Sequence, residues 1–423
     1  MLLEFGGRNF YSFKEGFQVN LREKKNSLEA HTLMGIKGAN ASGKTTVLKA
    51  LDYLKEICTN PFDRKTEKFD YEPFLFDEIT PNQNTKFELE FIQNKLKYFY
   101  EVELNRNYIV KEKLYNFNPN KAVVFERTTN DEKELTSIKF GSKIEIKKSF
   151  QKIIELHTLW NNTVLGALLK TNIDIEELTN VSEWFNSFTN FFNADSDSKD
   201  FFTTQIDLNR INKKIIISFL KKADFNICDL EVNKKEDSHL RQLLLKSIRE
   251  AKNDNEKSRY IEMLDSEVVF NRHLYFYHKV NNIDYKLNIN QESLGTQRYF
   301  EYAGLLSILL EQKVFLPVDE LESSLHPDLF NHFLLTYLVN GKKESQLIAT
   351  THNREILNNR DIFRDDAIWF TDKNEDSATE LYSLADFDSS VVRDTTNVLN
   401  AYKSGKLGGV PNLGDYYINL DEE

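Results

Sequence analysis

Cysteine is scarce in this sequence of 423 residues, and the two that occur, Cys58 and Cys228, lie far apart. Two isolated thiols at this separation form neither a disulfide framework nor a metal-binding cysteine pattern. The scarcity therefore favours a reducing compartment, and we expect a cytoplasmic protein.

Long hydrophobic runs are also missing. No uninterrupted apolar stretch approaches the roughly 20 residues that a helix needs to cross a bilayer. The opening residues, MLLEFGGRNFYSF, lack the basic segment and apolar core of a signal peptide. We therefore expect no membrane insertion, although the chain could still serve membrane-bound partners.

Basic residues do not dominate the sequence. It has 55 Lys and Arg against 66 Asp and Glu, a formal net charge of -11. This balance argues against a surface that is basic everywhere, so DNA binding would need a local patch. The length allows one large or two medium domains with a buried core, and no Pro- or Ser-rich linker divides the chain.

The most informative segment is GANASGKT at residues 38–45, which matches G-x-x-x-x-G-K-[ST] in full. Gly38 and Gly43 let the backbone curl so that successive N–H groups face a polyphosphate. Lys44 then reaches the β and γ oxygens, and the Thr45 hydroxyl is placed to ligate Mg²⁺. These residues predict a phosphate-binding Walker A loop.

The surroundings of this loop fit that interpretation. Residues 32–36 are apolar, as in a buried strand, and residues 46–51 have spacing compatible with a helix. We expect the loop and the start of the helix to bind ATP through Gly38, Ala39, Asn40, Ala41, Ser42, Gly43, Lys44, Thr45 and Thr46.

The interior of the loop carries a resemblance. Asn40, followed by Ala41 and Ser42, gives the form G-x-N-[GA]-x-G-K-[ST], which resembles the ATPase heads of SMC proteins, RecF and ABC-type relatives. The resemblance implies that the Asn40 side chain lies near the γ-phosphate and the attacking water. No N-K-x-D guanine motif occurs in the chain, so ATP is the expected nucleotide.

A second apolar strand, residues 314–318, ends in the carboxylates Asp319 and Glu320. In a P-loop ATPase this is the Walker B strand, where Asp319 would hold Mg²⁺ and Glu320 would orient and deprotonate water. Pro317 is an objection because it removes a donor from a central strand. The following residues, 321–327, resemble the D-loop run of ABC-type ATPases.

Two further segments extend the resemblance. Residues 346–353 are expected to form another apolar strand that ends in a histidine, and His352 resembles the switch histidine that contacts the γ-phosphate. Residues 292–298, ESLGTQR, resemble the ABC/SMC signature motif. Ser293, Gly295 and Thr296 at a helix start would form an anion site, and the resemblance implies that it closes over the ATP of a second subunit. A homodimer or higher homo-oligomer is therefore expected.

The expected fold class is α/β: an ABC-type P-loop NTPase head, with a mixed sheet and an antiparallel β subdomain, split by a helical insertion. Alternating residues predict antiparallel strands at 86–91, 98–104 and 122–125. Residues 238–265 predict an exposed helical hairpin or arm. We expect an N-terminal ATPase lobe at 1–146, a helical insertion at 147–266 and a C-terminal ATPase lobe at 267–423.

One part of the ABC-type pattern has no counterpart. The Q-loop glutamine is expected near residues 163–170, which contain none, and Gln151 is nearby but out of context. A Toprim nuclease domain is not expected either. Asp386 and Asp388 resemble its D-x-D motif, but we interpret them as a solvated turn.

The whole length resembles stand-alone ATPases of bacterial anti-phage defence, the AbiL/RloA-type abortive-infection group, with an OLD-like head lacking Toprim. The segments concerned are residues 8–15, 222–230 and 402–411. This resemblance implies a cytoplasmic, ATP-hydrolysing sensor or regulator of a partner effector, a toxin or nuclease, with ATP and Mg²⁺ as cofactors. A RecF-like DNA-repair ATPase that clamps DNA, and an ATP-gated scaffold with slow hydrolysis, stay open as alternatives.

Overall fold

The computed structural model describes residues 1–23, 26–189, 192–193, 198–223, 226–251, 253–342, 344–387 and 398–411. The chain forms two compact units. The first unit contains Met1–Asn193, Lys313–Leu321 and Lys342–Glu423, and the second contains Ala194–Gln312 and Glu322–Gly341. These units do not follow the three consecutive segments expected from the sequence, and that three-part division stays a prediction.

The first unit contains a seven-stranded antiparallel sheet. Buried apolar side chains alternate with more exposed ones along its central strands, the pattern of a sheet with one face on the core. Three of its strands confirm those predicted from alternation. In order across the sheet, its strands are β10 (Leu135–Phe140), β9 (Lys121–Asn130), β8 (Ile109–Phe117), β7 (Leu96–Leu104), β6 (Thr85–Gln93), β1 (Leu2–Arg8) and β2 (Phe17–Asn20).

The first unit also contains a six-stranded mixed sheet. A separate two-stranded sheet consists of β3 (Arg22–Glu23) and β4 (Asn26–Ala30). All of its strands are parallel to their neighbours except the last, which is antiparallel. The order is β11 (Phe192–Asn193), β15 (Phe315–Asp319), β16 (Gln346–Thr351), β5 (Leu33–Gly38), β17 (Ile368–Lys373) and β18 (Thr379–Ser383).

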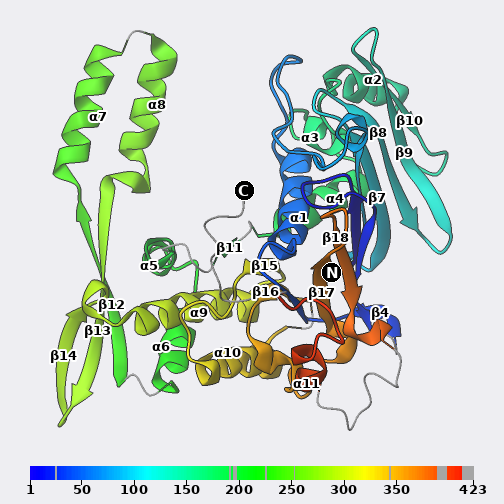
Figure 1. Cartoon of the computed structure of the whole chain (residues 1–423). Coiled ribbons are helices and arrows are strands. Elements are labelled where there is room, and N and C mark those ends of the chain that lie inside the picture. Colours follow the sequence, from blue (N-terminus) through cyan, green and yellow to red (C-terminus); the bar gives the residue numbers. More distant parts are fainter. Residues whose placement is uncertain are drawn as a thin grey trace, which may run out of the picture. The chain divides into compact units, whose positions relative to one another are not determined.

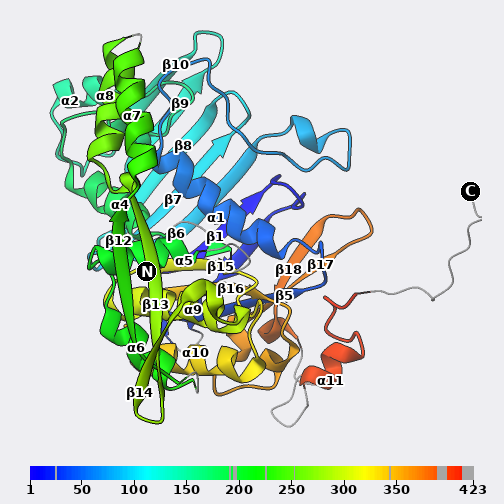
Figure 2. The same cartoon turned by 90° about the vertical axis from the view of Figure 1, so that its left-hand side faces the viewer.

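Helix α1 (Lys44–Thr59) crosses a face of the seven-stranded sheet in Figure 2. Its apolar residues Val47, Leu51 and Leu54 share one buried core with Phe87 and Tyr98 of the sheet. This core fixes the helix that follows the phosphate loop. The remaining helices of the unit are α2 (Lys148–His157), α3 (Val164–Leu168), α4 (Glu176–Ser187) and α11 (Val398–Lys403).

The mixed sheet contains strands from distant parts of the sequence. Strand β5 lies between β16 and β17, and β16 in turn pairs with β15, where Pro317 lies opposite Ile348. The side chain of Gln346 bonds to the backbone of Leu2 and of His31, which joins β16 to the N-terminal strand. The expected mixed α/β fold with an antiparallel β subdomain is confirmed.

The second unit combines helices with a three-stranded antiparallel sheet, β12 (Ile227–Glu236), β13 (Phe270–Val280) and β14 (Ile283–Asn288). Helices α7 (Ser238–Glu250) and α8 (Asp254–Asp265) lie side by side beyond the ends of β12 and β13 (Figure 1), which confirms the predicted helical hairpin. The other helices are α5 (Lys199–Asp207), α6 (Lys213–Lys221), α9 (Leu294–Glu311) and α10 (Pro327–Asn340).

Strand β12 is a departure from the helical insertion expected at residues 147–266. Only Ile227, Leu230 and Val232 are apolar in its ten residues, so alternation is weak in the sequence. Pairing with the long strand β13 stabilises it instead.

No helix in the described ranges is long and apolar enough to cross a membrane.

Candidate functional site

The candidate site lies where β5 passes into α1, at the carboxyl end of the parallel strands. Residues 39–43 connect the two elements, as the sequence predicts. Ala41 and Gly43 both have left-handed backbone, with φ of 60° and 103°. A Cβ on Gly43 would also collide with the Thr379 side chain. The loop therefore requires glycine at this position for both reasons.

Lys44 is the first residue of α1, and its side chain folds back over the loop. Its Nζ donates to the carbonyl oxygens of Gly38, at 3.1 Å, and Ala39, at 2.9 Å. The residue is buried, at 6% exposure. The ammonium group is thus held within the loop, where it can exchange carbonyl partners for phosphate oxygens.

Thr45, Asp319 and Thr350 form a hydroxyl–carboxylate–hydroxyl cluster. Thr45 Oγ1 donates to Asp319 Oδ2 at 2.9 Å, and Thr350 Oγ1 donates to Asp319 Oδ1. The structure therefore brings together the two residues predicted to hold Mg²⁺, from α1 and the end of β15. One hydroxyl and one carboxylate, completed by phosphate oxygens and water, fit the oxygen coordination that this ion prefers.

Glu320 follows Asp319 in a left-handed conformation, with φ of 52°. Its backbone N–H donates to Thr350 Oγ1 at 2.9 Å. Its carboxylate Oε1 lies 3.8 Å from Nε2 of His352, and both side chains are partly exposed. Lys37 Nζ donates a hydrogen bond to the carbonyl oxygen of His352 at 2.9 Å. Glu320 and His352, the two residues predicted to be catalytic, are therefore adjacent and partly exposed to solvent.

Three hydroxyl side chains around the loop were not predicted from the sequence. Thr371 Oγ1 lies 2.6 Å from Ser42 Oγ. Thr379 Oγ1 donates to the carbonyl of Ser42 at 2.9 Å and also contacts Ser12, which donates to Thr46 at 3.2 Å. Thr371 and Thr379 lie on β17 and β18, and Ser12 belongs to the turn after β1. The only sequence signal for any of these three residues was the resemblance of residues 8–15, which include Ser12, to the anti-phage defence ATPases.

Ser42 and Asn40 differ in exposure within the loop. Ser42 is 2% exposed because it faces β17, whereas Asn40 is exposed to solvent, as the predicted contact with a nucleotide requires.

The segment at residues 402–411 lies against the strand next to the loop. Tyr402 Oη donates to the carbonyl of Gly409 at 2.9 Å, and the Gly409 N–H donates to Asp372 Oδ2 at 2.8 Å. Lys37 lies over the Tyr402 ring, 5.0 Å from its centroid. Burial is the main cause that raises the pKa of the Tyr402 phenol. This tail therefore supports β5 and β17 at the end that carries the loop.

The predicted signature residues belong to the second unit. Ser293 caps the N-terminus of α9: its Oγ accepts from the Thr296 N–H at 3.1 Å and lies 2.9 Å from Thr296 Oγ1. A Cβ on Gly295 would meet no atom closer than Ser293 Oγ, at 3.8 Å. Leu294 is 74% exposed. This surface is open at the start of an 18-residue helix, where backbone N–H groups attract anions.

Two further sequence interpretations have different outcomes. Asp386 accepts the Ser383 N–H at 2.8 Å in a capping box, so it has a local structural role. Asp388 lies outside the described residues, as do Asp224 and Phe225 of the mid-chain motif. Residues 163–169 form α3 and its two caps, and residues 163–170 contain no glutamine, so the Q-loop position stays unassigned.

The solved structures that this chain is similar to include SMC heads, all at low sequence identity. For the "SMC head domain from Thermotoga maritima", identity is 13%, coverage 90% of this chain and 98% of that chain, and TM-score 0.44. For the SmcHead bound to the C-winged helix domain of ScpA, the values are 10%, 90%, 97% and 0.44. For the Smc head with an extended coiled coil bound to the C-terminal domain of ScpA derived from Pyrococcus furiosus, they are 12%, 90%, 96% and 0.37.

The comparison with curated proteins finds no match. A protein-family model matches residues 33–358, and its description is "AAA domain, putative AbiEii toxin, Type IV TA system". The match includes the loop, Asp319 at the end of β15, Glu320 after it, the α9 start and His352. Because it spans well over half of the sequence, the chain belongs to this family of AAA-type ATPase domains.

Proposed function

We propose that this chain binds ATP with Mg²⁺ at the β5–α1 loop and hydrolyses it. One observation carries the proposal: Lys44, Thr45, Asp319, Glu320 and His352, from three segments of the sequence, converge on the same end of the parallel sheet. A structural reason alone does not account for two acids and a lysine gathered around a loop of this shape. Membership of an AAA-type family supports the same activity.

Each residue has a role that its position supports. The loop N–H groups and Lys44 bind the β- and γ-phosphates. Thr45 and Asp319 would hold Mg²⁺, which supplies charge neutralisation on the phosphates when it is bound. Glu320 orients the attacking water and takes its proton, while His352 contacts the γ-phosphate beside it. Thr350 fixes the position of both acids, because its hydroxyl donates to the Asp319 carboxylate and accepts from the Glu320 N–H.

We also propose that the site is completed by a second copy of the chain. Ser293, Gly295 and Thr296 cap an exposed helix start that is open above Gly295. Leu294 beside them is 74% exposed, so no side chain of the described residues covers this end of the helix. Closure of this surface over the γ-phosphate of a partner subunit would make ATP the link of a homodimer.

At the level of the cell, the proposed role is a cytoplasmic sensor or regulator of a partner toxin or nuclease in anti-phage defence. The family description, which mentions a toxin and a type IV toxin–antitoxin system, supports this role. We expect a gene for such an effector beside the gene for this chain. Co-expression of the two should change the growth of a bacterial host, and loss of ATP binding should remove that change.

The activity is tested by phosphate release from ATP in the presence and absence of Mg²⁺, with Lys44→Ala as the comparison. We expect Mg²⁺-dependent hydrolysis, and we expect Lys44→Ala to bind ATP at least about tenfold more weakly because the phosphates lose their cation. Lys49→Ala, on the exposed side of α1, is the matched control. Equal hydrolysis by Lys44→Ala and the parent would contradict the site.

A further inference from the structure

The outer strand of the three-stranded sheet in the second unit has an open edge. The strand order is β12, β13, β14, so β14 pairs with β13 on one side only. No described residue pairs with its other side, where β14 forms the margin of this sheet in Figure 1. Every residue from Ile283 to Leu287 is exposed. This edge therefore has room for another strand.

The turn between β13 and β14 determines which backbone groups point outward. Residues 281–282, both asparagine, have φ of 49° and 61° and form a two-residue hairpin turn. The residues that flank such a turn exchange hydrogen bonds, and bonded pairs then alternate with non-bonded pairs along the strands. In agreement with this alternation, the Lys279 N–H donates to Asn226, before β12, at 3.2 Å. The N–H and C=O groups of Asp284 and Lys286 therefore point away from β13.

Strand β14 carries few of the features that keep an open edge from pairing. Proline, bulges and covering elements are common, as are charges that repel a second strand. Residues 283–288, IDYKLN, contain no proline, and the register with β13 shows no bulge. The strand does carry charges, but Asp284 and Lys286 have opposite signs. A second strand with the reverse order of charges would be attracted.

The same strand has an apolar face that the described residues cover only at one end. Leu287 lies opposite Phe276 of β13, which is buried and packs on Phe300 of α9 with ring centroids 5.7 Å apart. This face of β14 continues through Tyr285 to Ile283, which are 51% and 56% exposed. An additional strand beside β14 would extend the apolar face and cover part of it.

The sequence of β14 complements itself in the reverse direction. In an antiparallel pair of two β14 strands centred on Tyr285, Asp284 of each chain lies opposite Lys286 of the other. Ile283 lies opposite Leu287, and the two Tyr285 side chains lie beside each other. Each charged pair is attractive, and each apolar pair continues the apolar face. This register also brings the outward N–H and C=O groups of Asp284 to those of Lys286.

Neighbouring registers lack this complementarity. A pair centred on Asp284 or on Lys286 places two identical charges opposite each other, which is unfavourable. A shift by one residue places Tyr285 opposite Lys286, so that apolar side chains meet charged ones. A strand of an unrelated protein would use the backbone groups alone, whereas a second copy of β14 also satisfies the order of its charges.

We propose that β14 pairs with β14 of a second copy of the chain, so that two three-stranded sheets become one six-stranded antiparallel sheet. A two-fold axis through Tyr285 closes this contact, so it joins two chains and does not continue into a fibre. The contact uses no residue of the ATP site and needs no nucleotide. A chain that used this contact and the proposed ATP-linked contact at once would assemble beyond a dimer.

Sedimentation equilibrium of the full chain without nucleotide tests the pairing, in a Lys44→Ala background that removes the proposed ATP-linked dimer. The mass should rise with concentration from 49.6 kDa toward twice this value. Asp284→Lys or Lys286→Asp alone should weaken self-association about tenfold, because two attractive pairs become repulsive. The double variant Asp284→Lys/Lys286→Asp should restore association, which a mere loss of folding would not allow.

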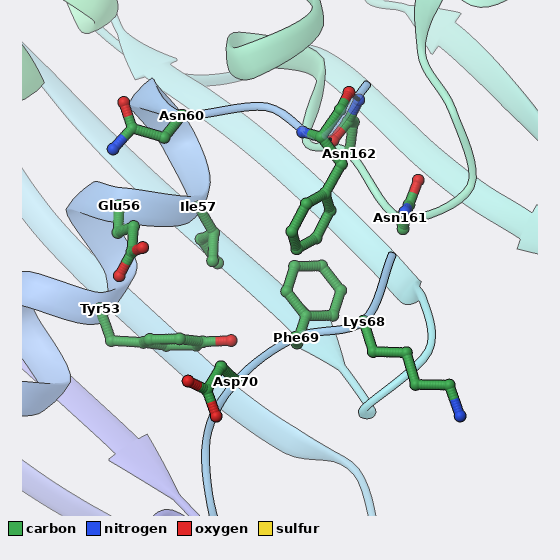
Figure 3. A pocket seen from close by; sticks show the side chains of 10 residues that line it. Tyr53, Glu56, Ile57, Asn60, Lys68, Phe69, Asp70, Asn161 and Asn162 are labelled. Carbon is green, nitrogen blue, oxygen red and sulfur yellow. Dashed lines mark hydrogen bonds between the residues drawn. The ribbon is translucent and has the colours of Figure 1, made fainter. Parts of the chain in front are cut away.

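The control for these variants is Lys68→Asp, the same charge reversal at an exposed lysine of the first unit. Lys68 lines the pocket in Figure 3, where its side chain runs away from the Phe69 ring. This variant should associate like the parent. A parent that stays at the mass of one chain up to about 100 µM would overturn the proposal and leave the edge to a different protein. Failure of the double variant to restore association would also overturn it.

Disulfide formation between identical chains tests the register. In the proposed pair, Tyr285 faces its own copy in a non-hydrogen-bonded position, where Cα atoms lie about 4.5 Å apart and a disulfide can form. With Cys228→Ser to remove the more exposed native thiol, Tyr285→Cys should give a covalent dimer on mild oxidation without nucleotide. Ile283→Cys should not, because it lies four residues from its copy along the strands. Equal yields from the two variants would overturn this register.

Discussion

At the scale of single residues, the site depends on a few atoms whose chemistry cannot be replaced by shape. Glu320 is the clearest case, because Gln has the same size but cannot accept a proton. We expect Glu320→Gln to keep ATP binding, since Lys44, Thr45 and Asp319 are unchanged, and to lower turnover by about 10²–10⁴-fold. Phosphate release and fluorescent-nucleotide binding, measured side by side, check both halves of this expectation.

Glu344→Gln is the control for that variant, because Glu344 is an exposed acid whose partner is Lys313. It should hydrolyse ATP at the parental rate. Parental turnover by Glu320→Gln would show that another group takes the proton, and the assignment of Glu320 as the base would then be wrong.

Gly43 supports a second prediction at this scale. Its φ of 103° and the Thr379 side chain beside it leave no room for a methyl group. Gly43→Ala should lose nucleotide binding and destabilise the protein by about 1–3 kcal/mol, whereas Gly16→Ala, with open space around it, should do neither. Thermal unfolding with and without ATP checks this pair. A Gly43→Ala protein with the parental shift in Tm on adding ATP would contradict the loop geometry.

At the scale of elements, prediction from sequence succeeded where a strong local pattern coincides with a strand or helix. The apolar runs before residue 38 and before Asp319 became β5 and β15, and the hairpin of α7 and α8 followed from its spacing. Strand β12 was missed because few of its residues are apolar and its pairing with β13 is a non-local contact.

The candidate site divides in the same way. Lys44, Thr45, Asp319 and Glu320 follow from motifs of consecutive residues. Thr371 and Thr379 could not be predicted, because their roles come from the pairing of β17 with β5 and β18, which brings lone threonines to the loop. A hydroxyl in an ordinary strand carries no local signal of such a contact.

A buried polar network links elements of the first unit and predicts a pH effect. Tyr100 donates to Glu112 Oε1 at 2.9 Å, the Val164 N–H donates to Glu112 Oε2 at 2.8 Å, and the Arg127 charge lies nearby. Burial is the largest cause that raises the pKa of Glu112, from 4.5 to about 7. The folded protein therefore holds this proton more tightly than the unfolded chain does.

The contribution of Glu112 to the free energy of unfolding is accordingly full below about pH 4.5 and is lost as pH rises toward about 7. The loss is on the order of 1–3 kcal/mol. Chemical denaturation between pH 5 and 8 should show a flatter profile for Glu112→Gln than for the parent, while the exposed Glu145→Gln should keep the parental slope. Identical slopes in all three proteins would mean that Glu112 does not titrate in this window.

At the scale of the whole molecule, the account rests on a second chain. The start of α9 presents Ser293 and an exposed Leu294 to solvent, and the phosphate loop presents Ala41. In the proposed homodimer, the start of α9 of each chain would meet the phosphate loop of the partner chain. The two surfaces therefore do not have to meet within one chain. Heads joined by ATP and separated after hydrolysis would give an effector protein a signal that depends on nucleotide state.

Crosslinking between chains that each carry one introduced cysteine tests this central claim most directly. One chain carries Ala41→Cys and the other Leu294→Cys, both with Glu320→Gln to preserve ATP and with Cys228→Ser to remove the more exposed native thiol. Ala41 is preferred to Ser42, which is buried against Thr371. Separate chains exclude intramolecular products. Mixed with ATP, they should form a crosslinked dimer that is lost with Lys44→Ala. A product of equal yield without ATP, or none with ATP, would contradict a dimer joined by nucleotide.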